Sequence, residues 1–98
     1  MNKKCIASFQ FLPIGKEEKM IEDIDQIIEL IRTLQLKFQV TPFETVVEGS
    51  FNEIQNLLSS LYSKSMQLNC NQFLLNMKLH VNHLENLSFE KNTEKYSI

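Results

Sequence analysis

The chain has 98 residues, of which 43% are hydrophobic and 22% are charged, as is ordinary for one globular domain. Its net charge of -2, from 10 basic and 12 acidic residues, provides no general attraction for nucleic acid or an anionic membrane. No apolar run approaches the ~20 residues that span a bilayer, and the first residues do not resemble a signal peptide. We therefore expect a cytoplasmic protein with a single domain over residues 1–98, its core at about 4–81 and a polar tail at 82–98.

The first predicted element is a strand at residues 4–12, where side chains alternate with the period of two. Pro13 and Gly15 end this strand as a turn. Ser8 and Gln10 point to the face opposite the core. The predicted core set, which includes a buried free thiol, is Cys5, Ala7, Phe9 and Phe11.

A long amphipathic helix is predicted at about residues 16–34, because apolar residues there recur at spacings of three and four. Glu17, Glu18 and Glu22 lie early in this segment, as the helix dipole favours. The stripe expected to be buried consists of Met20, Ile21, Ile24, Ile27, Ile28, Ile31 and Leu34.

Two strands follow within residues 36–49, because alternation returns and Pro42, which lacks an N–H, interrupts it near Thr41–Phe43. Gln39 and Glu48 fall on the outer face of these strands, whereas the parity of Thr45 places it on the helix side.

A capping box of the form S-x-x-E at residues 50–53 starts a second helix, predicted from about Phe51 to Met66. The last strand is predicted at residues 73–81, and residues 88–98 can add a short final helix. The second helix is expected to bury Ile54, Leu57, Leu58, Leu61 and Tyr62.

This order of elements is that of the ferredoxin-like βαββαβ sandwich, an α+β fold with a four-stranded antiparallel sheet and both helices on one face. The first and third strands are central in it, so Ser8 and Gln10 are expected beside Glu44, Val46 and Glu48 on the open face. Two interpretations of that face stay open. It is either a solvated sheet surface or a subunit interface that encloses a polar ligand pocket.

The sequence carries no motif for catalysis, metal binding or RNA recognition. His80 and His83 would point to opposite faces of a strand, so they do not form a zinc site. Gly15 and Gly49 are the only glycines, which excludes a glycine-rich phosphate loop. The central strands lack outward aromatics for RNA, and Arg32, the only arginine, lies in the first helix, whereas an acylphosphatase-like enzyme needs one after the first strand. We expect no catalytic residue, metal or cofactor.

The stretches ASFQFLPIG and VTPFETVVEGSFNEI resemble the thiamine-binding protein family, small ferredoxin-like proteins related to the thiamine/hydroxymethylpyrimidine-binding protein of Bacillus. That family has a first strand that ends in Pro-x-Gly and a Pro-x-x-Thr-x-x-Glu-Gly motif before its second helix. Pro42, Thr45, Glu48 and Gly49 match the second motif, and the resemblance covers about residues 5 to 81.

The chain departs from the family pattern at two places. Gln35 stands where the family commonly has a glycine at the end of the first helix. The last strand ends in HVNHLEN, where the family usually has acidic residues followed by arginine.

The resemblance implies non-catalytic binding of thiamine or a related pyrimidine, such as hydroxymethylpyrimidine, by a homodimer or homotetramer. Glu48 would offset the thiazolium charge, and the neutral polar side chains would serve the aminopyrimidine. For Thr45 a buried or turn-stabilising hydroxyl is the alternative, and Glu48 could instead neutralise a lysine at a subunit interface. The expected ligand-binding residues are Ser8, Gln10, Gln39, Thr45 and Glu48.

Three functional classes stay open at this point. The first is a carrier, buffer or sensor of thiamine that has no nucleic-acid or membrane partner. The second is a structural or regulatory assembly module that binds no ligand, and the third is an enzyme.

Overall fold

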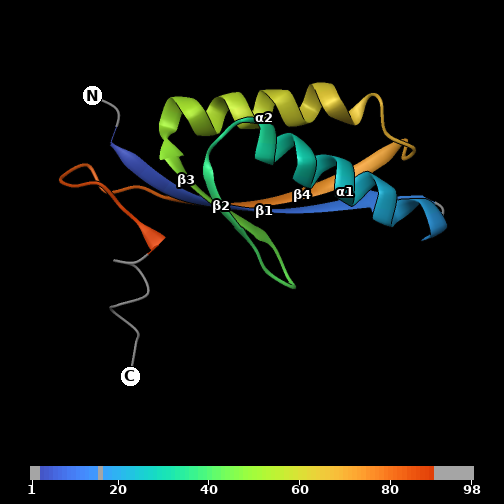
Figure 1. Cartoon of the computed structure of the whole chain (residues 1–98), viewed down its shortest axis with the longest axis horizontal. Helices are drawn as coiled ribbons and strands as arrows, with labels where there is room; N and C mark the ends of the chain where they lie inside the picture. The colour runs from blue at the N-terminus through green and yellow to red at the C-terminus, as the bar shows by residue number, and fades with distance from the viewer. Residues whose placement is uncertain (1–2, 16, 90–98) are drawn as a thin grey trace.

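A computed structural model describes residues 3–15 and 17–89 of the chain, and Figure 1 shows two helices lying on one side of a sheet. Each strand and helix predicted within residues 4–81 is present, and the first strand continues through Pro13, where a turn was predicted, because Pro13 and Ile14 still pair with the last strand. The bounds of these elements are β1 Lys4–Ile14, α1 Glu17–Thr33, β2 Lys37–Val40, β3 Thr45–Ser50, α2 Phe51–Ser65 and β4 Gln72–His80.

The four strands form one antiparallel sheet in the order β2-β3-β1-β4. The long strand β1 is central and pairs with β3 on one side and with β4 on the other. Both helices cover the same face of the sheet, and neither α1 nor α2 covers the opposite face, which is called the open face below (Figure 1). The ferredoxin-like α+β fold is thereby confirmed.

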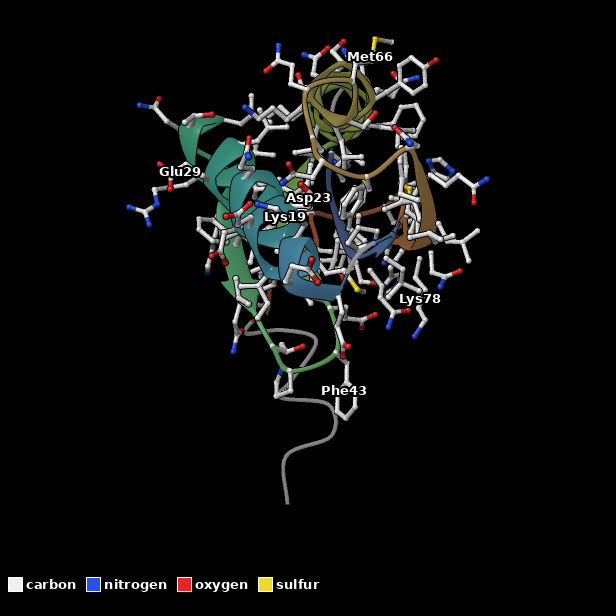
Figure 2. All side chains as sticks on the ribbon, turned by 90° about the vertical axis from the view of Figure 1, so that its right-hand side faces the viewer. Lys19, Asp23, Glu29, Phe43, Met66 and Lys78 are labelled. Atoms are coloured by element: carbon white, nitrogen blue, oxygen red, sulfur yellow. The ribbon has the colours of Figure 1, made fainter. Side chains whose placement is uncertain are left out.

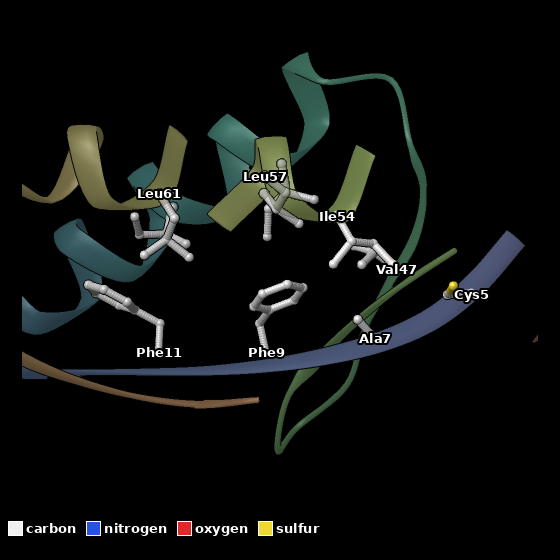
Figure 3. Packing of buried hydrophobic residues seen from close by; sticks show 10 residues of the cluster. Cys5, Ala7, Phe9, Phe11, Val47, Ile54, Leu57 and Leu61 are labelled. Carbon is white, nitrogen blue, oxygen red and sulfur yellow. The ribbon is translucent and has the colours of Figure 1, made fainter. Parts of the chain in front are cut away.

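The core lies between β1 and the two helices, and Figure 3 shows the β1 side chains pointing toward α2. The predicted β1 set is confirmed, since all four of its side chains are buried. Phe11 also contacts the ring of Phe73 on β4, with ring centroids 4.9 Å apart. The buried cluster comprises Cys5, Ala7, Phe9, Phe11, Ile27, Ile31, Val47, Ile54, Leu57 and Leu61.

Three apolar residues expected in the core are exposed instead. Ile21 is 71% exposed because it lies about 200° around α1 from the buried residue Asp23, outside the core-facing stripe. Leu58 and Tyr62 are 40% and 61% exposed, since they lie to one side of the α2 face that contacts the core. Their side chains line a groove between α2 and β4.

The β2–β3 connection is a tight turn at residues 41–44, where a strand interruption was predicted. The Thr41 backbone N–H donates to the Glu44 carbonyl at 2.9 Å, and the Thr41 hydroxyl donates to the same oxygen at 2.7 Å. Phe43 lies at the tip, 80% exposed, and Figure 2 shows it pointing away from both helices.

The predicted capping box is confirmed at the start of α2. Ser50 Oγ accepts from the Glu53 N–H at 3.1 Å, while Glu53 Oε1 accepts from the Ser50 N–H at 2.8 Å. These two bonds satisfy backbone groups that the first helical turn leaves unpaired. The helix therefore begins directly where β3 ends.

The segment after β4 returns to the sheet, although its composition suggested only a polar tail. Leu87 is buried, and its N–H donates to the Lys4 carbonyl at 3.0 Å. The Lys4 N–H in turn donates to Asn86 Oδ1 at 2.7 Å. Phe89 follows on the open face, beside Glu48. The final helix predicted at residues 88–98 lies outside the described residues beyond residue 89.

Candidate functional site

The open face carries four of the five predicted ligand-binding residues, in rows set by the strand register. In one row, Val46 stands between Gln39 on β2 and Ser8 on β1. Lys78 completes that row on β4. Glu48 belongs to the next row, where it is opposite Ile6.

Ser8 is the buried polar residue at the centre of this face. It is 8% exposed, and its Oγ has no hydrogen-bond partner within the described part of the chain. A buried hydroxyl without a partner is costly. A group from outside the described chain that bonds to this hydroxyl would offset that cost.

Glu48 is the acidic group of the face, with a side chain that is only 11% exposed. Its Oε1 atom accepts a hydrogen bond from the backbone N–H of Phe89 at 3.0 Å. The Nζ atom of Lys37, the residue opposite it on β2, lies 4.0 Å from the same oxygen. Lys37 of the same chain therefore lies within ion-pair distance of Glu48, and the alternative in which Glu48 neutralises a lysine at a subunit interface stays a prediction.

Gln10 and Gln39 flank the centre of the face. Gln10 Oε1 accepts from the Nδ2 group of Asn76, its partner on β4, at 3.1 Å. This contact fixes the amide and leaves the Gln10 NH2 group directed elsewhere. Gln39 is exposed on the short strand β2. Both side chains can donate and accept hydrogen bonds.

The structure separates Gln10 from Glu48 by more than the sequence suggested. Glu48 is opposite Ile6, four residues from Gln10 along β1, which corresponds to about 13 Å. Ser8 lies between them. The three polar side chains thus extend along the open face, with Gln10 at one end and Glu48, on β3, at the other.

Thr45 lies on the opposite side of the sheet from these residues. It is buried and faces the helices, as its parity indicated. Together with the backbone turn at 41–44 and residues of α1, it lines a cleft of about 230 Å³. Its position favours the buried-hydroxyl interpretation, while direct contact with a ligand on the open face would require passage through the sheet.

Gly49, the last residue of the Pro-x-x-Thr-x-x-Glu-Gly motif, has a packing role. A Cβ atom at this position would lie 3.2 Å from Glu53 Oε1 and 3.3 Å from Leu36 Cδ2. The residue is therefore small because the capping-box side chain of Glu53 and the side chain of Leu36, just before β2, approach its backbone closely. The motif positions Glu48 at the point where β3 meets α2.

Sequence reasoning missed Asp23, a buried carboxylate on α1. Its oxygens accept from the backbone N–H groups of Asn69 and Cys70, both at 2.9 Å. Burial raises the pKa of Asp23, but the hydrogen bonds from Asn69 and Cys70 outweigh it, so the net pKa is lowered. The available signal was an aspartate in the apolar stripe, four residues before Ile27.

The same carboxylate affects Cys70 and borders a larger cavity. Burial raises the pKa of the Cys70 thiol, and the hydrogen bond and negative charge of Asp23 add to this effect.

A cavity of about 540 Å³ adjoins these residues between Gly15, Lys19 and the loop before β4. Figure 2 shows Lys19 and Asp23 together on α1. Because Asp23 already has its hydrogen bonds, its role is to hold that loop.

Two further observations bear on the functional class. Within residues 3–15 and 17–89, no three His, Cys, Asp or Glu side chains are grouped so as to hold a metal ion. Across the same residues, neither helix has the length and apolar character that a bilayer crossing requires.

The chain belongs to the thiamine-binding protein family, whose sequence profile matches residues 7–97. A UPF0045 protein of Clostridium perfringens is 33% identical over 54 residues, which span 55% of this chain and 57% of that protein. The chain thus spans just over half the length of this curated relative.

Solved structures agree with this assignment. A Thermotoga maritima protein proposed to act in thiamine biosynthesis or salvage is 28% identical, with a TM-score of 0.86 over 96% of this chain and 99% of that one. A Streptococcus pneumoniae protein is 32% identical, with a TM-score of 0.78 over 93% and 98% of the two chains. The family resemblance seen in the sequence is thereby confirmed.

Proposed function

We propose that this chain is a non-catalytic binding protein for thiamine or a related pyrimidine such as hydroxymethylpyrimidine. It would act as a carrier, buffer or sensor. The observation that carries the proposal is the match to the thiamine-binding family over almost the whole chain. In this proposal the ligand lies along the open face, with its pyrimidine near Gln10 and Ser8 and its cationic ring toward Glu48.

The chemistry of the open face supports this assignment. Aminopyrimidines need both donors and acceptors, which the amides of Gln10 and Gln39 provide. The Ser8 hydroxyl lies buried between the two ends of the site and lacks a partner among the described residues. The nearly buried carboxylate of Glu48 supplies the negative charge that a thiazolium ion requires.

We further propose that the protein works as a homodimer or homotetramer in which a second subunit covers the open face. Leu74 is 58% exposed on this face, and Ile6, Leu12 and Val46 are half-buried there. A partner subunit would remove these apolar side chains from water and enclose the polar side chains between them.

Calorimetric titration with thiamine and hydroxymethylpyrimidine tests the binding proposal. Replacing Gln10 and Glu48 by alanine should weaken thiamine binding by about tenfold to a hundredfold, because the variant loses a charge-assisted contact and an amide contact. The control carries the same two residue changes on the helices, at Gln55 and Glu29, and should bind as the wild type does. No heat from folded wild-type protein at millimolar thiamine would contradict the proposal.

The alternative function, an assembly module without ligand, is favoured by one observation. Glu48 already has partners within the chain, Lys37 and the Phe89 N–H. If the Gln10 and Glu48 double variant loses its oligomeric state in solution, and the wild type binds neither compound, this alternative is correct.

A further inference from the structure

A carboxylate, an ammonium group and an aromatic ring meet at the end of the open face where β2, β3 and the C-terminal segment come together. Lys37 Nζ lies 4.0 Å from Glu48 Oε1 and 5.2 Å from the centroid of the Phe89 ring. The Phe89 N–H donates to the same Oε1 atom at 3.0 Å. Glu48 and Phe89 thus hold a cation between them, and here the cation is a lysine of the same chain.

The two sides of this arrangement differ in how firmly they are held. The Glu48 side chain is 11% exposed and is fixed by a central strand and by the Phe89 N–H, whereas the Lys37 side chain is 47% exposed on the edge strand β2. A long, flexible lysine at the upper distance limit for an ion pair contributes little to stability. Loss of this ion pair leaves Glu48 with its hydrogen bond from the Phe89 N–H.

We propose that Glu48 and Phe89 form the subsite for the positively charged group of an organic cation, which enters by displacing the Lys37 ammonium. This inference rests on the proposed function, in which that group is the thiazolium ring of thiamine. The face of an aromatic ring attracts cations, and the nearby carboxylate adds a charge-assisted contact. A flat cationic ring can stack on Phe89, which a compact, strongly hydrated ammonium group cannot do.

The subsite gives Lys37 and Phe89 a role in specificity. Gln10 is four residues along β1 from the Glu48 row, about 13 Å away, so the two ends of the ligand are recognised separately. The Lys37 ammonium competes for Glu48 only with the cationic end of the ligand. A neutral pyrimidine without the thiazolium ring does not need to displace it and gains nothing from Phe89.

The Lys37→Met variant tests this competition, because methionine keeps an apolar stem and removes the ammonium group. It should bind thiamine about three- to tenfold more tightly than the wild type, and it should bind hydroxymethylpyrimidine with unchanged affinity. The matched control is Lys64→Met, which removes one positive charge from the last turn of α2, on the helix side of the sheet. That variant should change thiamine affinity by less than about twofold at physiological salt.

A second variant pair tests the aromatic ring. Phe89→Leu retains an apolar side chain and the backbone N–H, so Glu48 keeps its hydrogen bond. In the Lys37→Met background, Phe89→Leu should remove most of the gain in thiamine affinity. Equal thiamine binding by the wild type, Lys37→Met and Lys64→Met, or an equal gain in both lysine variants, would overturn the subsite and leave the proposed function standing.

Tetramethylammonium, a cation without any pyrimidine, separates the subsite from the proposed function. Should none of the proteins bind thiamine, the proposed function fails, and NMR of the Phe89 ring during titration with tetramethylammonium decides the subsite. A saturable shift of the ring resonances in Lys37→Met, larger than in the wild type and reduced by Glu48→Gln, supports it. No shift in folded Lys37→Met protein overturns it.

Discussion

At the end of α1, the backbone of Gln35 has a φ of 60°, and its N–H donates to the Arg32 carbonyl at 3.1 Å. A positive φ at this position closes many helices, and glycine adopts it without the steric cost that a Cβ atom brings. The thiamine-binding family commonly has glycine here. The departure from the family pattern is therefore a matter of local backbone strain at the end of α1.

Gln35→Gly should stabilise the protein by about 0.5–1 kcal/mol, because relief of the strained φ exceeds the added entropy of the unfolded chain. The control is Gln67→Gly, since Gln67 does not have a positive φ and should lose stability on the same change. Urea unfolding measures both differences. A less stable Gln35→Gly variant would show that the side chain contributes more than its backbone conformation costs.

Among the secondary-structure elements, α1 is joined to the loop before β4 chiefly by Asp23, and the neighbouring Glu22 accepts one further hydrogen bond from the Asn69 amide at 3.1 Å. Asp23 accepts backbone hydrogen bonds from Asn69 and Cys70, which follow α2 in the sequence. It also accepts from the Asn69 side-chain amide at 3.1 Å. These bonds span 46 and 47 residues of sequence, so they hold the end of the sheet to the first helix.

Asp23→Asn should destabilise the protein by about 1–3 kcal/mol at neutral pH, because the new amide NH2 group cannot accept the hydrogen bond that one carboxylate oxygen now accepts. Asp25→Asn is the control, an exposed aspartate on the same helix, and should change stability by less than about 0.5 kcal/mol. The comparison is made by urea unfolding.

The difference between wild type and Asp23→Asn should also depend on pH. The folded state lowers the pKa of Asp23 from 3.8, so the unfolded state binds more protons in the interval below that value. The contribution of the carboxylate is therefore complete above pH 3.8 and is lost as the pH falls through the folded pKa. A difference in stability that stays constant from neutral pH to about pH 2.5 would contradict this assignment.

Local periodicity was sufficient to predict the elements of this fold and most of its core. Alternation placed Phe9 and Phe11 in the core, and the capping box located the start of α2. Periodicity could not show which edge of the apolar stripe on α2 contacts the sheet, so Leu58 and Tyr62 were assigned to the core in error. The burial of Leu87 also depends on a backbone pairing with Lys4 that no local pattern encodes.

The sequence predicted on which face of the sheet each candidate residue lies, but it did not predict which residues each one contacts. Strand alternation was sufficient to place Ser8, Gln10 and Glu48 on one face and Thr45 on the other. Which residues share a row depends on the strand register, and the register separates Gln10 from Glu48. The Phe89 contact arises because the chain returns to the sheet after β4, which depends on tertiary structure.

For the molecule as a whole, three features occur together on the open face. A buried hydroxyl at Ser8 lacks a partner in the described chain, a nearly buried carboxylate at Glu48 binds an internal cation, and apolar side chains surround them. A small domain gains stability when such a face is covered. Assembly and ligand binding would then use the same surface.

Native mass spectrometry of the whole chain with added thiamine measures both properties in one spectrum. We expect a dimer or tetramer that carries up to one thiamine per subunit, since each chain supplies one Glu48. The Gln10 and Glu48 double-alanine variant should show the same assembly with the thiamine largely lost. A folded wild-type protein that shows no thiamine-bound species at millimolar ligand would contradict the central claim.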